Sequence, residues 1–198
     1  MHTALWRTLT GLAVAAVAVI AVAEPTAADA QAAQSARRGE SLAPFVPTPQ
    51  DVVERMLALA QVTSKDVVYD LGSGDGRLVV TAAKKFGARG VGIDIDPARI
   101  AEGRANARQA GVEQLVEFRQ QDALETDLSQ ASVVTLYLLS SSNVKLRPRL
   151  ASQLKPGARV VSHQFGMGDW TPEKVETFTD SNGTGRTLYL WTIGANTK

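Results

Sequence analysis

The sequence predicts an α/β fold, with a doubly wound, mostly parallel sheet of seven strands that follows a helix and ends in an antiparallel hairpin. Three observations lead to this prediction. Short apolar runs alternate with stretches that carry apolar residues at helical spacing. A glycine-rich turn joins the first apolar run to the next helical stretch. The last two apolar runs flank residues 181–185, SNGTG, whose turn-forming residues favour a hairpin.

The expected elements follow in chain order. A first helix begins after Thr48 and Pro49, with acidic Asp51 in its first turn. Strands are expected at residues 67–69, 90–96, 116–120, 133–139, 159–165, 175–178 and 187–193. Further helices are expected at residues 78–86, 99–109 and 143–154. Residues 124–131 are too few for a full helix and are expected to form a loop or a single turn.

Composition limits the functions that this chain can have. The 198 residues are 44% hydrophobic, which is ordinary for a globular chain. The 21 basic and 20 acidic residues give a net charge of +1, and no dense basic block follows Arg37 and Arg38, so we expect no nucleic-acid partner. The sequence has no cysteine and two histidines, which excludes disulfides, thiolate sites and a multi-histidine zinc site. We therefore expect no metal.

The N-terminal residues have the pattern of a targeting segment. Arg7 precedes an uncharged run over residues 9–23, and small residues follow at 21–23 and 28–30. This pattern predicts a secretory signal peptide over residues 1–30, cleaved after Ala30 or after Ala23, or an uncleaved membrane anchor. Either alternative predicts an exported domain, periplasmic or extracellular. Residues 31–43 are expected to be a disordered linker, and residues 44–196 the folded domain.

The glycine-rich turn lies in residues 67–77, VVYDLGSGDGR, between the first strand and the second helix. Its three alternating glycines allow a ligand to lie against bare backbone, at the N-terminus of a helix that presents free N–H groups. The spacing differs from the dinucleotide fingerprint GxGxxG, because Arg77 follows the third glycine, and no GK[ST] sequence follows. Asp70 at the end of the strand suits a cationic ligand better than a pyrophosphate.

A second acidic strand end lies in residues 90–96, GVGIDID. Asp94 follows the glycine turn by about 20 residues, the distance at which an acid accepts hydrogen bonds from ribose hydroxyls. We prefer Asp94 to Asp96 for this role, because Asp94 is at the strand tip. Asp96 with Pro97 after it is typical of a helix N-cap.

The motif DLGSGDG at the end of a first strand, followed by the acidic tip of a second, resembles the class I S-adenosylmethionine-dependent methyltransferases. The resemblance implies a Rossmann-like sheet and S-adenosylmethionine as the cofactor. In that family the acid at the strand end and the glycine backbone hold the methionine part, and the segment like residues 121–123 contacts the adenine. The resemblance assigns cofactor binding to Asp70, Gly72, Ser73, Gly74, Asp94, Ile95, Asp122 and Ala123.

A narrower resemblance rests on PFVPTP before the first helix, on DLGSGDGR, and on HQFGMGDWTP late in the chain. These motifs are similar to those of the small lysine methyltransferases of the mitochondrial ATP-synthase c-subunit type and their bacterial relatives. The resemblance covers about residues 44–193 and implies N-methylation of a protein lysine. The alternatives are a small-molecule methyltransferase and a non-catalytic domain that binds S-adenosylmethionine. Predicted export keeps the last one open, because this cofactor is not expected to be plentiful outside the cytoplasm.

Polar residues at the ends of the fourth and fifth strands are candidates for the catalytic site, because ligands bind at the carboxyl ends of strands. Tyr137 is expected to orient the acceptor amine or to line the methyl pocket. His163 titrates near neutral pH and is a candidate base, with Asp169 to hold or charge it. Relatives tend to have proline at the position of Ser140, so the resemblance does not extend to the substrate loop. The sequence indicates no oligomeric state.

Overall fold

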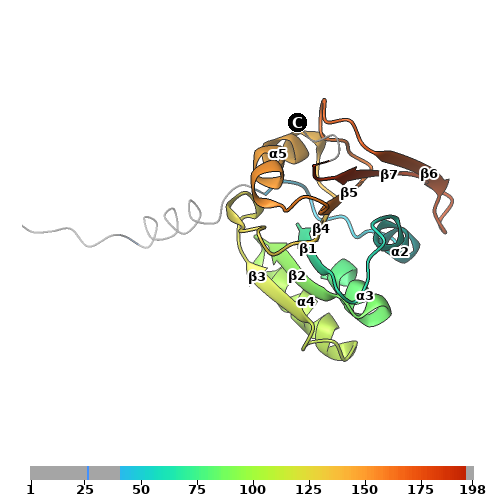
Figure 1. Ribbon diagram of the computed structural model, residues 1–198. Helices are drawn as coiled ribbons and strands as arrows, with labels where there is room; N and C mark the ends of the chain where they lie inside the picture. The colour runs from blue at the N-terminus through green and yellow to red at the C-terminus, as the bar shows by residue number, and fades with distance from the viewer. Residues whose placement is uncertain (1–25, 27–40, 195–198) are drawn as a thin grey trace, which may run out of the picture.

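Segments of four to eight residues, apolar in the centre of the sheet and mixed with polar residues at its edges, form the strands, and longer segments form the helices. A computed structural model describes residue 26 and residues 41–194 of the chain (Figure 1). The helices are α2 (Gln50–Leu59), α3 (Arg77–Phe86), α4 (Pro97–Gln109) and α5 (Ser140–Gln153), with a short 3₁₀ turn, η1 (Ala123–Glu125). The strands are β1 (Val67–Leu71), β2 (Arg89–Asp94), β3 (Val116–Gln120), β4 (Val133–Leu136), β5 (Arg159–His163), β6 (Lys174–Thr179) and β7 (Gly185–Thr192).

The strands form one seven-stranded sheet in the order β3-β2-β1-β4-β5-β7-β6. The five strands from β3 to β5 are parallel, and β7 runs antiparallel between β5 and β6. This confirms the predicted doubly wound sheet and its C-terminal hairpin. The chain moves outward from β1 through β2 to β3 and then returns to place β4 on the other side of β1. The order therefore reverses between β1 and β4, which is where open α/β sheets bind ligands.

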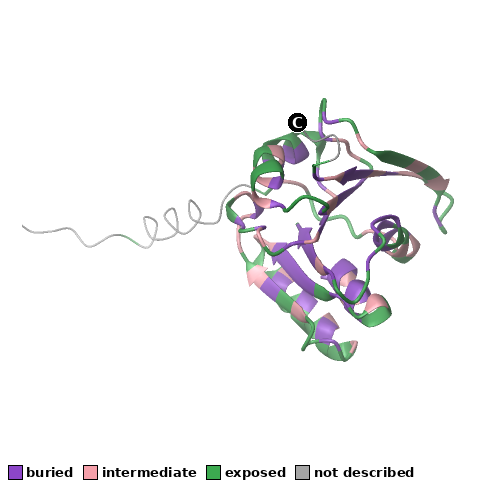
Figure 2. Cartoon of the chain, in the orientation of Figure 1, coloured by how far each residue is buried: buried purple, intermediate pink, exposed green. Residues whose placement is uncertain are grey.

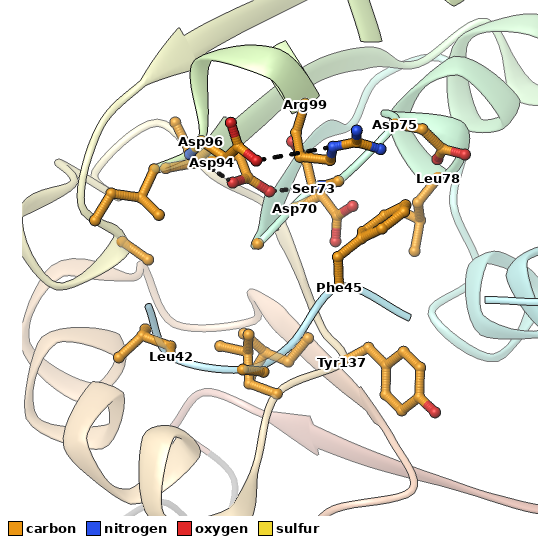
Figure 3. Close-up of a pocket in the computed structure, with 18 of the residues that line it drawn as sticks. Leu42, Phe45, Asp70, Ser73, Asp75, Leu78, Asp94, Asp96, Arg99 and Tyr137 are labelled. Carbon is orange, nitrogen blue, oxygen red and sulfur yellow. Dashed lines mark hydrogen bonds and ion pairs between the residues drawn. The ribbon is translucent and has the colours of Figure 1, made fainter. Parts of the chain in front are cut away.

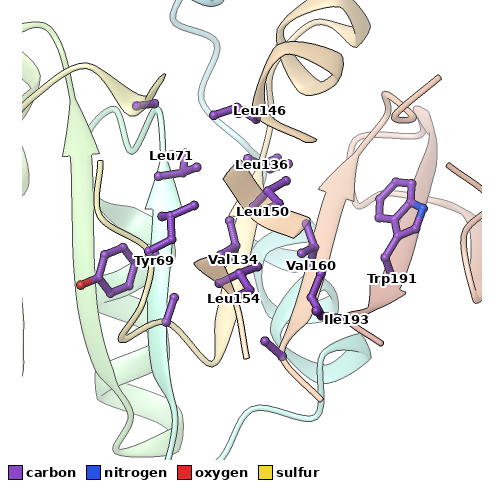
Figure 4. Close-up of a cluster of buried hydrophobic side chains, with 14 of the residues drawn as sticks. Tyr69, Leu71, Val134, Leu136, Leu146, Leu150, Leu154, Val160, Trp191 and Ile193 are labelled. Atoms are coloured by element: carbon purple, nitrogen blue, oxygen red, sulfur yellow. The ribbon is translucent and has the colours of Figure 1, made fainter. Parts of the chain in front are cut away.

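Helices cover both faces of the sheet, and alternate residues of each strand point to opposite faces. On one face, α2 and α3 pack against Val68, Val133 and Val161, while α4 packs with α3 against Phe118. On the other face, α5 and the η1 region cover Leu71, Val134 and their neighbours (Figure 4). The central strands are buried, and exposed residues lie on the outer surfaces of the helices and along β6 (Figure 2). This packing fixes the carboxyl ends of β1, β2 and β4 beside one another.

Three strands end two or more residues earlier than predicted. Strand β2 stops at Asp94 instead of residue 96, because Asp96 is the N-cap of α4. Strand β4 stops at Leu136 instead of residue 139, because the next three residues leave the sheet and α5 begins at Ser140. Strand β5 stops at His163 instead of residue 165, because Gln164 has a φ of 67° and turns the chain. The residues that were expected within these strands instead lie in the connections at the carboxyl edge of the sheet.

The N-terminal predictions fall mostly outside the described residues. Apart from residue 26, the predicted leader at 1–30 lies outside them, as do residues 31–40 of the predicted linker and residues 195–196 of the predicted domain. Residues 42–43, also assigned to the linker, are packed: Leu42 and Ala43 contact the core, and Ser142 Oγ donates to the Leu42 carbonyl at 2.5 Å. The packed domain therefore extends at least to Leu42. No helix in the described part of the chain is long and apolar enough to cross a membrane.

Candidate functional site

A pocket lies at the carboxyl ends of β1, β2 and β4, where the strand order reverses (Figure 3). One wall is the extended segment of residues 41–48, which we call the strap. A second wall, which the strap contacts, is the glycine turn with the start of α3 and the tip of β2. Residues 121–123 and residues 136–138 close the remaining sides.

The pocket brings together every residue that the sequence assigned to cofactor binding. Three strand ends and the η1 turn supply them, because the carboxyl ends of parallel strands meet at one edge of a sheet. They are Asp70, Gly72, Ser73, Gly74, Asp94, Ile95, Asp122 and Ala123.

Hydrogen bonds hold the glycine turn against the tip of β2. The backbone N–H groups of Gly72 and Ser73 both donate to the Ile93 carbonyl, at 2.9 and 2.8 Å. The Gly74 N–H donates to Asp94 Oδ2 at 2.8 Å. Gly72 has a φ of 82°, a left-handed conformation that only glycine adopts without strain. The hydroxyl of Ser73 is buried against Gly92 of β2 and has no hydrogen-bond partner among the described residues.

Asp70 is a buried carboxyl at the inner end of the pocket. Burial raises the pKa of Asp70 to about 7; the hydrogen bond from Thr135 Oγ1, 2.7 Å long, lowers this pKa, and the nearby acids Asp94 and Asp75 raise it. Asp70 is therefore close to half-ionised at neutral pH. A cationic ligand beside it would favour the ionised form.

The two other predicted acids each cap a helical turn. Asp96 accepts from the Ala98 N–H at 2.8 Å and caps α4, with Pro97 at the first helical position, as predicted. Asp122 Oδ1 accepts from the Leu124 N–H at 2.8 Å and caps η1. Both carboxyl groups still line the pocket.

Acidic side chains dominate the pocket. Two basic residues line it, Arg77 and Arg99. The lining acids are Asp70, Asp75, Asp94, Asp96 and Asp122. Arg77 is paired with Asp75, with Nη2 2.5 Å from Oδ2, and Arg99 is paired with Glu102, with Nη1 2.5 Å from Oε2. Since both guanidinium groups are neutralised by carboxylates, the pocket favours a cationic ligand over an anionic one.

The three predicted catalytic residues lie in different environments. Tyr137 lines the pocket, directly after β4. His163 is 0% exposed behind Tyr137, with ring centroids 4.0 Å apart, and neither ring nitrogen has a partner in the described part of the chain. Burial, with a smaller effect of Arg186, lowers the pKa of His163 to about 4. The Asp169 side chain is 88% exposed and pairs with Arg147, so the structure does not bring it to His163.

Sequence analysis missed the strap as a pocket wall. Phe45 lies on it, and Arg77 holds its C-terminal end by donating from Nη1 to the Thr48 carbonyl at 2.7 Å. The motif PFVPTP contributed only to the family resemblance. No periodicity in it indicates that the segment crosses the sheet edge, because an extended, proline-rich stretch has no amphipathic pattern.

A nucleoside-sized pocket at the switch point of this sheet, with an acidic tip on each of two strands, defines a class I S-adenosylmethionine-dependent methyltransferase. The chain belongs, within that class, to the family described as the ANTKMT methyltransferase domain, whose model matches residues 70–174. The excess of carboxylates fits a cofactor that carries an ammonium and a sulfonium group.

Comparison with known proteins agrees with this assignment. The chain is 46% identical to a protein-lysine N-methyltransferase of Saccharolobus islandicus, over 76% of this chain and 94% of that protein. It is 33% identical to the human lysine N-methyltransferase of the ATP-synthase c-subunit, over 67% of this chain but only 56% of the human protein. A crystal structure described as an RNA methyltransferase from Salinibacter ruber, in complex with S-adenosyl-L-homocysteine, is 58% identical with a TM-score of 0.71 and covers 76% of this chain and 95% of that one.

Proposed function

We propose that this methyltransferase transfers the methyl group of S-adenosylmethionine to the side-chain amine of protein lysines. The observation that carries the proposal is the acidic pocket, whose two basic residues are both paired with carboxylates. Such a pocket attracts a lysine, which reaches it as an ammonium ion. The names of the relatives from Saccharolobus islandicus and human support the same acceptor.

The proposed cofactor contacts follow from the geometry of the three strand ends. Asp70 and the backbone at Gly72–Gly74, which includes Ser73, would hold the amino-acid part of the cofactor. Asp94, fixed by the Gly74 N–H, would accept from the ribose hydroxyls, with Ile95 beside it. Asp122 and Ala123 would contact the adenine. Bound S-adenosylmethionine supplies an activated methyl group, so the protein needs only to align the acceptor and exclude water.

We place the acceptor side of the pocket at the strap and Tyr137, which both line it. A lysine must lose a proton before its nitrogen can attack. His163 is not part of the pocket lining, and its position behind Tyr137 keeps it from the acceptor. We therefore propose that Tyr137 lines the acceptor channel and that the amine loses its proton to water, with His163 as a support for the tyrosine ring.

RNA methylation is a second candidate, favoured by the description of the Salinibacter ruber structure. The acidic pocket opposes it, because carboxylates repel the phosphate backbone of a nucleic acid. Incubation of the protein with radiolabelled S-adenosylmethionine and a bacterial extract separates the two candidates. Label that protease releases and ribonuclease does not is the expected result. Label that ribonuclease alone releases would overturn the lysine proposal, and an Asp94→Ala variant provides the background.

We also propose that residues 1–30 export the domain or anchor it in a membrane, since an uncharged run follows Arg7. Cell fractionation and mass spectrometry of the N-terminal peptide test this. A mature chain that begins at residue 31 in the periplasmic or secreted fraction is expected for a cleaved leader. An intact N-terminus in the membrane fraction would show an anchor, and an intact N-terminus in the soluble cytoplasmic fraction would contradict both.

A further inference from the structure

The strap carries an aromatic ring into the pocket next to the glycine turn. Phe45 lines the pocket, and Figure 3 shows its ring between Asp70 and Leu78. A Cβ added at Gly74 would lie 2.4 Å from Phe45 Cε2, so the ring fills the space that the missing side chain leaves. Gly74 is also the residue whose N–H binds Asp94. The ring therefore touches the point where the glycine turn meets the tip of β2.

The strap is held at both ends. Near its N-terminal end, Ser142 Oγ donates to the Leu42 carbonyl at 2.5 Å, and Leu42 and Ala43 pack against the core. At its C-terminal end, Arg77 Nη1 donates to the Thr48 carbonyl at 2.7 Å. The two prolines within the strap restrict its backbone further. Phe45 thus lies on a preorganised segment and not on a free arm.

Arg77 joins the strap to the glycine turn. While Nη1 binds the Thr48 carbonyl, Nε donates to both carboxylate oxygens of Asp75 at 3.0 Å. Asp75 is itself fixed, because Asn106 Nδ2 donates to its carbonyl at 2.9 Å. One guanidinium therefore sets the distance between the strap and the turn that binds the cofactor.

Phe45 nevertheless remains 49% exposed, with the Arg99 guanidinium 4.6 Å from the ring centroid. A large aromatic side chain exposed at the mouth of a ligand pocket offers apolar surface for a ligand to cover. Its π-face also attracts cations, as the contact with Arg99 shows. The cofactor carries two cationic groups, so it can use both properties.

We propose that Phe45 is a cofactor-contacting residue that covers bound S-adenosylmethionine beside the glycine turn, and that Arg77 is a positioning residue that holds Phe45 there through the Thr48 carbonyl. The inference rests on the cofactor assignment and is independent of the methyl acceptor. It gives the strap a function in retaining the cofactor, beyond closing one side of the pocket.

Calorimetric titration with S-adenosylhomocysteine tests the role of Phe45. The Phe45→Ala variant is expected to bind about tenfold more weakly than the wild type, and Phe45→Leu about threefold, because the aromatic face and part of the covered surface are lost. The loss should appear mainly as faster dissociation in a stopped-flow displacement experiment. Val175→Ala is the matched control, because Val175 is 51% exposed on β6 and lies outside the pocket lining.

A double-mutant cycle tests the role of Arg77. Arg77→Gln should weaken binding in the same direction as Phe45→Ala, and the double variant should be no weaker than Phe45→Ala alone, because Arg77 acts through the ring. Additive losses would overturn the positioning role. Affinity within about twofold of wild type in both folded Phe45 variants would overturn the cofactor contact. A wild-type protein that does not bind S-adenosylhomocysteine would instead overturn the cofactor assignment itself.

Discussion

The carboxyl group of Asp70 is buried, and it lies close to other acids of the pocket. Burial raises its pKa from 3.8 to about 7, so in the free protein its protonated form is stabilised below neutral pH. Without ligand, the contribution of Asp70 to stability is complete below the unfolded pKa and is lost as pH rises through about 7. A ligand ammonium group needs the ionised form and so reverses this preference.

We therefore predict that S-adenosylhomocysteine binding strengthens as pH rises through about 7 and then levels off. Below that point the affinity should fall by about tenfold per pH unit, with release of a proton on binding. Calorimetry in buffers of different ionisation enthalpy measures both quantities. In Asp70→Asn this pH dependence should be absent; a variant that keeps it would show that another group titrates.

His163 is the second residue for which the structure changes the expectation. Its position at the end of β5 suggested a base, but its ring is buried against Tyr137 and both nitrogens lack partners among the described residues. A buried imidazole without partners contributes no hydrogen bond to stability, and an apolar ring in its place removes two unsatisfied atoms.

We predict that His163→Phe keeps the methyl-transfer rate within about threefold of wild type, because the ring that supports Tyr137 is retained. The pH profile of the rate should also be the same in both proteins, with only the ionisation near pH 7 that Asp70 causes, since the pKa of His163 is lowered to about 4. Steady-state assays across pH measure both. Loss of activity in a folded His163→Phe protein would contradict this account and support His163 as the catalytic base.

At the scale of elements, helix α4 lies close to the sheet because Gly103 faces it. A Cβ at this position would lie 2.5 Å from Phe118 Cε1 on β3. Alanine would improve helix propensity by about 1 kcal/mol, but overpacking a core contact costs about 1–3 kcal/mol. The second effect is the larger, so the glycine is there for packing.

We predict that Gly103→Ala lowers the free energy of unfolding by about 1 kcal/mol, as measured by urea denaturation. In a Phe118→Leu background, where the ring no longer fills the space, the same change should become neutral or stabilising. Equal destabilisation in both backgrounds would contradict the packing explanation.

The ends of the elements show where sequence patterns stop being informative. The N-cap of α4 at Asp96 was predictable, because a capping acid before a proline is a local signal. The ends of β4 and β5 were not. Tyr137 and the two leucines after it are as apolar as the strand before them, and the left-handed turn at Gln164 is made by a residue that rarely adopts it.

At the scale of the whole molecule, parallel strands explain why so much of the cofactor pocket could be predicted. Asp70, Asp94 and Asp122 lie far apart in the chain, but each follows a strand or lies at its tip, and the carboxyl ends of these strands share one edge. Short local motifs therefore identified a site whose residues are far apart in the sequence. The strap could not be found in this way, because its contact with Gly74 joins two segments without any shared periodicity.

The same topology separates the two sides of the pocket. The glycine turn and the tips of β1 and β2 form the side assigned to the cofactor, while Tyr137 after β4 and the strap border the side open to an acceptor. All the lining carboxylates lie in segments assigned to the cofactor, and the basic residues are paired. The carboxylates therefore favour the cationic cofactor directly and attract a lysine ammonium group only through their longer-range field.

The most direct test is to identify the atom that receives the methyl group. The protein is incubated with S-adenosylmethionine that carries a deuterated methyl group and with a bacterial protein extract, and tandem mass spectrometry then locates the label. We predict deuterated methyl groups on lysine side chains with the wild-type protein and none with Asp94→Ala. Label found only on RNA, on small molecules or on other side chains would contradict lysine methylation by this pocket.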